Sequence, residues 1–183
     1  MPSHSSPEVV IAGGGIGGSA LAAVLAKAGI VTTILEKSTV HVDHVRGEWI
    51  APWGVAETQR LGLYDVLIKA GGHHLRRYVP YGDDIDIEAA EALTLNLTAF
   101  EGAGFKPPLC MRHPQMCDVL NAEAIASGAE LLRGVSDVEV IPGASPRLRF
   151  RQEGDAREVT PRIVIGADGR NSTVRRSKTP DRR

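Results

Sequence analysis

The chain has 183 residues, of which 43% are hydrophobic and 23% charged, and its formal net charge is −1. These proportions are ordinary for a globular protein with a core. The small net charge and the 4% of aromatic residues argue against a nucleic-acid-binding surface. No apolar run reaches the about 18 residues of a transmembrane helix, and residues 1–7 do not resemble a secretory signal. We therefore expect a cytoplasmic protein that binds neither nucleic acid nor membranes.

Residues of the metal-binding types do not form a ligand pattern. Cys110 and Cys117 are the only cysteines, which is too few for a disulfide framework in a chain of this length. We expect both to be reduced thiols of the core. His41, Asp43 and His44 follow one another in a polar loop, but without a fixed secondary-structure spacing. The sequence therefore predicts a solvated loop there and no metal site.

A glycine-rich turn follows the short apolar run at residues 9–12, which predicts a buried strand. Gly13, Gly15 and Gly18 fit the pattern G-x-G-x-x-G. Gly13 is predicted to make the tight turn, Gly15 to let a pyrophosphate approach the backbone, and Gly18 to let a helix pack closely. The N-terminus of that helix favours phosphate anions. Glycine-rich turns are common, so the motif alone is weak.

The residues after the turn complete a βαβ unit. Apolar residues recur with helical spacing up to Gly29, the expected C-terminal cap, and residues 30–35 form a β-branched run typical of a buried strand. Glu36 ends this run about 20 residues after the turn, where an acidic residue accepts hydrogen bonds from ribose hydroxyls. The alternative is a βαβ unit whose glycines serve only packing.

The sequence pattern changes between residues 46 and 108, where short helices and short strands are predicted. Short helices are predicted near residues 54–61 and 63–70, each followed by glycine. Ile85 and Ile87 alternate with acidic residues, which is typical of a half-buried strand, and leucines alternate in the same way up to Leu97. We expect two or three antiparallel strands between residues 75 and 97 that leave the βαβ core.

The last third of the chain predicts a helix, a meander and a further core strand. The helix runs from Pro114 to Gly128. Short strands separated by turn residues follow, and the next buried strand leads directly into Asp168 and Gly169. The predicted strands cover residues 129–132, 135–141, 147–151, 158–160 and 162–166.

Three separated segments together resemble one family. The most specific of them matches the motif D-G-x-x-S-x-x-R. The sequence from residue 8 to 175 resembles the N-terminal part of FAD-dependent aromatic hydroxylases, the para-hydroxybenzoate hydroxylase-like flavoprotein monooxygenases. The matching segments are the glycine turn with Glu36, Arg46 with the turn at residues 52–54, and the string 165–175 with Asp168, Ser172 and Arg175.

The resemblance implies an α/β fold: a Rossmann-like FAD-binding βαβ fold with a parallel core sheet, a β-meander crossover and a partial antiparallel substrate-domain sheet. It divides the chain by function. Residues 8–74 and 109–175 would belong to the FAD-binding domain, and residues 75–108 would supply strands of the substrate domain. Residues 1–7 and 176–183 would be tails.

The resemblance also implies FAD as cofactor, NADH or NADPH as electron donor, and oxygen insertion into a small organic, aromatic substrate. It assigns no catalytic residue. The glycine turn would hold the pyrophosphate of FAD, and Glu36 would hold its ribose. Two arginines and an aspartate would contact other parts of FAD. For the two arginines, the alternative is that they are surface residues without a role in binding. The implied cofactor-binding residues are Gly13, Gly15, Ile16, Gly18, Glu36, Lys37, Arg46, Arg112 and Asp168.

The sequence departs from the family in one respect. The family's later Gly-Asp motif, which contacts the ribitol of FAD, has no counterpart after Arg175; the pairs at Gly82 and Gly154 lie in polar turns. The chain therefore looks truncated, and we expect it to bind FAD weakly or not at all and to hydroxylate no substrate. Two alternatives stay open: a catalytically inactive nucleotide-binding module, and a fragment of a flavin-dependent reductase or halogenase relative.

Overall fold

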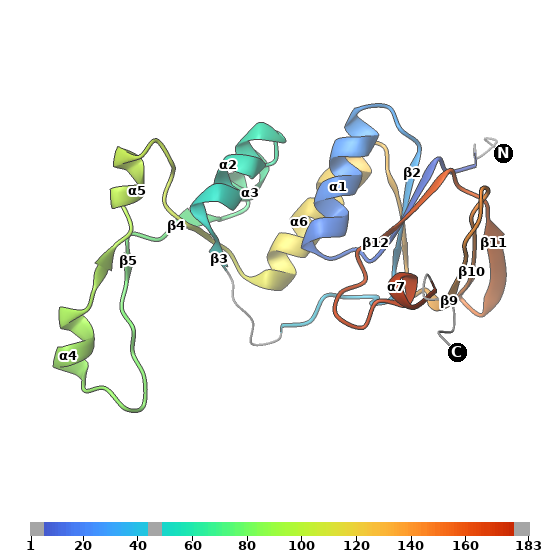
Figure 1. Ribbon diagram of the computed structural model, residues 1–183. Helices are drawn as coiled ribbons and strands as arrows, with labels where there is room; N and C mark the ends of the chain where they lie inside the picture. Colours follow the sequence, from blue (N-terminus) through green and yellow to red (C-terminus); the bar gives the residue numbers. More distant parts are fainter. Residues whose placement is uncertain (1–5, 44–48, 178–183) are drawn as a thin grey trace. The chain divides into compact units, whose positions relative to one another are not determined.

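The computed structural model describes residues 6–43 and 49–177, which form two compact units (Figure 1). The first unit comprises Met1–Val42 and Met116–Arg183, and the second comprises Asp43–Gln115. The boundaries of these units differ from residues 74 and 108, which are the boundaries of the functional division predicted from the sequence. That functional division stays a prediction.

A four-stranded parallel sheet is the centre of the first unit. Its order is β12-β1-β2-β8, and every neighbouring pair is parallel. The apolar composition of β1 fits its complete burial, as expected for a strand covered on both faces. The predicted parallel core sheet is confirmed. Its strands are β1 (Val9–Ala12), β2 (Thr32–Glu36), β8 (Glu130–Arg133) and β12 (Ile163–Gly166).

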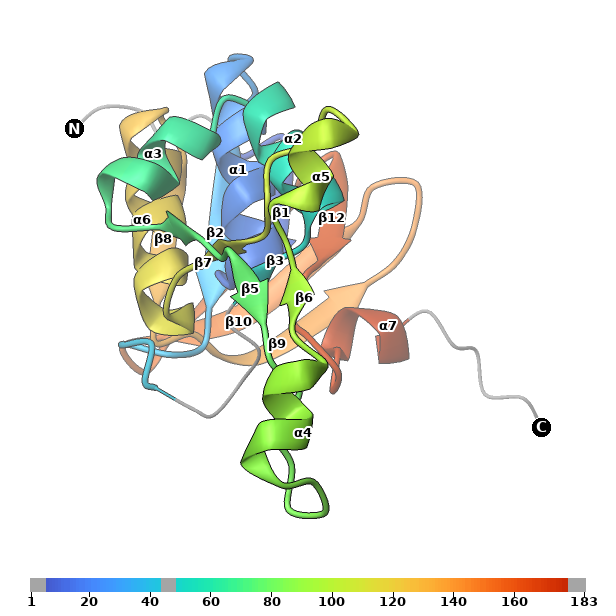
Figure 2. The ribbon, with the colours of Figure 1, turned by 90° about the vertical axis from the view of Figure 1, so that its left-hand side faces the viewer.

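Helices lie on one side of this sheet and an antiparallel meander on the other (Figures 1 and 2). The helices are α1 (Ile16–Lys27) and α6 (His113–Ala126), and α1 packs through small buried residues. The meander consists of β9 (Ser136–Ile141), β10 (Arg147–Gln152) and β11 (Asp155–Val159), and the short α7 (Thr173–Ser177) follows β12. The predicted meander crossover is confirmed.

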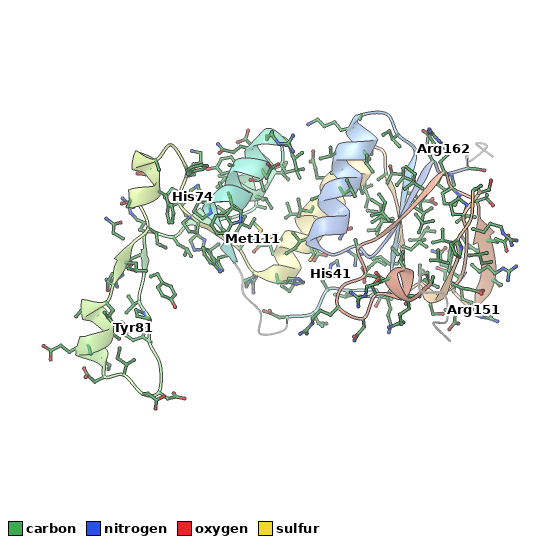
Figure 3. The ribbon with its side chains drawn as sticks, viewed as in Figure 1. His41, His74, Tyr81, Met111, Arg151 and Arg162 are labelled. Atoms are coloured by element: carbon green, nitrogen blue, oxygen red, sulfur yellow. The ribbon has the colours of Figure 1, made fainter. Side chains whose placement is uncertain are left out.

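The core between the two sheets depends on the period-2 alternation of β10. Leu148 and Phe150 are buried in one cluster with Val10 and Leu35 of the parallel sheet. The arginines that alternate with them face outward and form ion pairs with acidic residues of the neighbouring strands, as at Arg151, which is labelled in Figure 3. Exposed ion pairs of this kind contribute little to stability, so the apolar face determines how the meander packs.

The second unit contains short elements. Its three-stranded sheet has the order β3-β7-β4, and a separate pair is formed by β5 and β6. The buried residues include Val55, Leu67 and Leu109. Its elements are β3 (Trp49–Ile50), α2 (Pro52–Arg60), α3 (Tyr64–Lys69), β4 (His73–His74), β5 (Arg77–Tyr78), α4 (Ile87–Ala92), β6 (Leu95–Asn96), α5 (Ala99–Gly102) and β7 (Leu109–Cys110).

The strand predicted around Ile85 and Ile87 is wrong. Ile87 begins α4 instead, and the carboxylate of Asp86 accepts a hydrogen bond from the N–H of Ala89 at 2.9 Å. Asp86 is therefore an N-cap, and the alanines and glutamates after it are strong helix formers. The alternation at residues 85–88 was too short to outweigh these signals. No helix in the described parts of the chain has the length and apolarity needed to cross a bilayer.

We expect Leu148→Ala to lower the free energy of unfolding by about 2–5 kcal/mol, because Leu148 is fully buried between the two sheets. Arg149→Ala on the exposed face of the same strand is the matched control and should change it little. Urea denaturation followed by circular dichroism measures both. Equal losses for the two variants would contradict the described packing of β10.

Candidate functional site

The turns predicted to contact a cofactor lie at one edge of the parallel sheet. Gly13 follows β1, Glu36 ends β2, and Asp168 comes shortly after β12. Because these strands are parallel, their carboxyl ends share one edge. β2 and β12 lie on opposite sides of β1, so this edge is a topological switch point, where open α/β sheets bind ligands.

Two glycines of the turn are required by the packing of the protein itself. Gly13 has a φ of +108°, and a Cβ built on it would lie 2.4 Å from the carbonyl oxygen of Ala167. A Cβ built on Gly18 would lie 1.9 Å from the carbonyl oxygen of Gly13. The predicted tight turn at Gly13 and the close helix packing at Gly18 are confirmed.

Gly15 has no such internal reason to lack a side chain. It is the N-cap of α1, with an ordinary extended conformation, and a Cβ built on it has no neighbour within 4 Å. The space beside Gly15 would be filled by a side chain and is open to a group that approaches from outside. A pyrophosphate at the N-terminus of α1 fits this position sterically and electrostatically.

Glu36 joins the glycine turn to the end of β2. Its Oε2 accepts a hydrogen bond from the N–H of Gly14 at 2.6 Å, and its Oε1 accepts one from the N–H of Ser38 at 2.7 Å. The residue is only 9% exposed. Each carboxylate oxygen has a further lone pair, so Glu36 keeps acceptor capacity for a ribose hydroxyl. The ribose contact stays a prediction.

The turn is also supported from α6 by residues that the sequence analysis missed. The Nδ2 of Asn121 donates to the carbonyl oxygen of Gly14 at 2.9 Å, and the hydroxyl of Ser19 lies 2.9 Å from both that oxygen and the Oδ1 of Asn121. Both side chains are buried. The only signal in the sequence was an amide at position 121 within the apolar stripe of a predicted helix.

Asp168 caps α7. Its Oδ2 accepts hydrogen bonds from the N–H groups of Thr173 and Val174, at 2.6 and 3.3 Å. Burial acts to raise the pKa of Asp168, but the neighbouring Ser172 hydroxyl and these N–H groups outweigh it, so the pKa is lowered from its ordinary value. The Oδ1 is buried and has no hydrogen-bond partner among the described residues. It could accept a hydrogen bond from a ligand at this edge of the sheet.

The other predicted cofactor-binding residues have no structural test. Ile16 is the first residue of α1, and Lys37 is exposed directly after β2. Arg112 is exposed in the second unit, just before α6. Arg46 lies outside the described residues. The contacts of these four residues with a cofactor stay predictions.

The loop after β2 is attached to α6 by polar side chains. The Nδ1 of His41, labelled in Figure 3, lies 2.9 Å from a carboxylate oxygen of Asp118, which also pairs with Arg133 at 3.3 Å. This cluster fixes the loop that continues from Glu36. Across residues 6–43 and 49–177, no group of three or more metal-ligating side chains comes together.

Comparison with known proteins gives one family and several relatives. Residues 6–181 match the family model described as FAD binding domain. Squalene monooxygenase of Mus musculus is 27% identical over 94% of this chain and 30% of its own length. FAD-dependent monooxygenase pynG of Aspergillus niger is 30% identical over 94% and 38%, and menaquinone reductase of Mycolicibacterium smegmatis is 30% identical over 94% and 40%. The chain thus spans 30–40% of the length of these relatives.

The comparison with solved structures also finds a hydroxylase of which this chain covers about a third. OxyS anhydrotetracycline hydroxylase from Streptomyces rimosus superposes with a TM-score of 0.74 at 26% sequence identity. The match covers 93% of this chain and 33% of the hydroxylase. The α/β architecture with its parallel sheet is therefore shared with hydroxylases of this kind.

The lowered pKa of Asp168 gives stability a pH dependence. Because the pKa is lower in the folded chain, the cap is fully effective at neutral pH and is lost as the pH falls below the ordinary value of 3.8 towards the folded value. We expect Asp168→Ala to be less stable than wild type at neutral pH, with a difference that shrinks in acid. Asp168→Asn keeps a hydrogen-bond acceptor without the charge. The difference in free energy of unfolding between Asp168→Asn and Asp168→Ala should therefore not vary with pH. Denaturant unfolding at a series of pH values measures this; a difference between wild type and Asp168→Ala that stays constant into acid would contradict the capping role.

Proposed function

Because this chain belongs to the FAD-binding domain family, we propose that its glycine turn binds the pyrophosphate of FAD in a flavoprotein monooxygenase. An enzyme that contains this domain would use NADH or NADPH to insert oxygen into a small organic, aromatic substrate. The observation that carries the proposal is the open space beside Gly15, at the switch point of the parallel sheet. The relatives named as monooxygenases support the reaction type. A cytoplasmic location is part of the same proposal.

Each residue of the site has a role in binding. The N–H groups at the start of α1 would donate to phosphate oxygens, and the dipole of the helix would favour their negative charge. Glu36 would accept from a ribose hydroxyl while it fixes Gly14. Asp168, held by the N-terminus of α7, would accept from the ligand through its unpartnered Oδ1. FAD supplies, when bound, the redox chemistry that amino-acid side chains lack.

A reductase is the second candidate, because menaquinone reductase of Mycolicibacterium smegmatis is as similar in identity as the monooxygenase pynG. The two reactions differ in the fate of oxygen. With NAD(P)H and isotopically labelled O₂, a monooxygenase places the label in an aromatic substrate, whereas a reductase oxidises NAD(P)H with a quinone and incorporates none. Bound FAD with no oxidation of NAD(P)H in the presence of either acceptor would favour the inactive nucleotide-binding module.

We expect Gly15→Ala to weaken the binding of FAD and of ADP at least about tenfold, which corresponds to about 1.4 kcal/mol, because the added methyl group occupies the space assigned to the pyrophosphate. The free energy of unfolding should change by less than about 1 kcal/mol, since the methyl meets no protein atom. Isothermal titration calorimetry measures the binding. Gly143→Ala, in the turn before β10, is the control and should bind as wild type does. Unchanged affinity in Gly15→Ala would refute this placement of the pyrophosphate.

A further inference from the structure

The peptide group between Gly14 and Gly15 is hydrogen-bonded on one side only. Its carbonyl oxygen, on Gly14, accepts from the Nδ2 of Asn121 at 2.9 Å and lies 2.9 Å from the hydroxyl of Ser19. Its N–H group, on Gly15, has no partner among the described residues. The described peptide bonds are all trans, and in a trans peptide the C=O and N–H point in opposite directions. The hydrogen bonds of the Gly14 carbonyl oxygen therefore direct the N–H of Gly15 away from α6. The open space beside Gly15 lies on the outer side of the same turn.

The amide of Asn121 can have only one orientation. Its Nδ2 donates to two carbonyl oxygens, of Gly14 and of Cys117, both at 2.9 Å, and its Oδ1 lies 2.9 Å from the hydroxyl of Ser19. A flipped amide would place its oxygen against two carbonyl oxygens, which repel it. Asn121 is 2% exposed and Ser19 is fully buried, so no water competes for these groups. The hydrogen bonds of Asn121 thus fix the orientation of the Gly14 carbonyl.

We propose that Asn121 is a positioning residue, which aims the N–H of Gly15 at the pyrophosphate of the bound nucleotide without contacting the nucleotide itself. This inference rests on the proposed function. Two further hydrogen bonds, from Gly13 to the carbonyl oxygen of Leu35 and from Gly14 to Glu36, hold the turn at its start. Asn121 and Ser19 add the constraint that sets the direction of the next peptide. A preorganised N–H donor gains binding energy because no ordering cost is incurred when the ligand arrives.

The test compares ADP and AMP binding in wild type, Asn121→Ala and the double variant with Ser19→Ala. Leu120→Val is the control, because Leu120 is as buried as Asn121 on α6 and bonds nothing in the turn. We expect ADP affinity to fall about tenfold in Asn121→Ala and further in the double variant, with AMP, which lacks the pyrophosphate, affected about twofold at most. Leu120→Val should keep the wild-type preference for ADP over AMP.

A second readout follows the Gly15 amide directly. In ¹⁵N-labelled protein, ADP should shift the Gly15 N–H resonance in wild type and in Leu120→Val, and much less in Asn121→Ala. Wild-type ADP affinity together with a wild-type Gly15 shift in Asn121→Ala would overturn the inference and leave FAD binding in place. Equal losses for ADP and AMP would also overturn it, because they indicate a merely structural role. Absence of ADP binding in wild type would overturn the proposed function and this inference together.

Discussion

The hydrogen bond from the N–H of Gly14 to the carboxylate of Glu36 connects the ends of β1 and β2, and the geometry of the site depends on it. The carboxylate is almost completely buried, and its second oxygen is occupied by the N–H of Ser38. A buried charge is costly unless it is well hydrogen-bonded, and two backbone N–H groups supply what it needs. The same residue that is expected to bind a ribose is thus already a structural part of the turn.

The glycines of the turn differ in what requires them. Gly13 and Gly18 are fixed by the close approach of Ala167 and of the turn's own backbone, whereas the protein leaves the space beside Gly15 open. Packing alone therefore explains part of the motif, and the alternative of a βαβ unit with purely structural glycines leaves Gly15 unexplained. A site for an external anion would account for Gly15, the one position of the three that packing does not explain.

The sequence predicted the first unit well because its signals are local and periodic. The apolar run before Gly13, the β-branched run before Glu36 and the short run at residues 147–151 between turn residues each correspond to an observed strand. The second unit was harder, since its strands are two residues long and one apparent alternation belongs to a helix capped by Asp86. Asn121 could not be assigned a role from sequence, because its partner Gly14 lies 107 positions away and meets it only through tertiary packing.

The most direct test of the account is a crystal structure of the protein with ADP. We predict a phosphate oxygen of ADP within hydrogen-bond distance of the Gly15 N–H, with the carbonyl oxygen of Gly14 still bound to Asn121 and a ribose hydroxyl on Glu36. ADP bound elsewhere, or a Gly14 carbonyl that faces the ligand, would contradict the account.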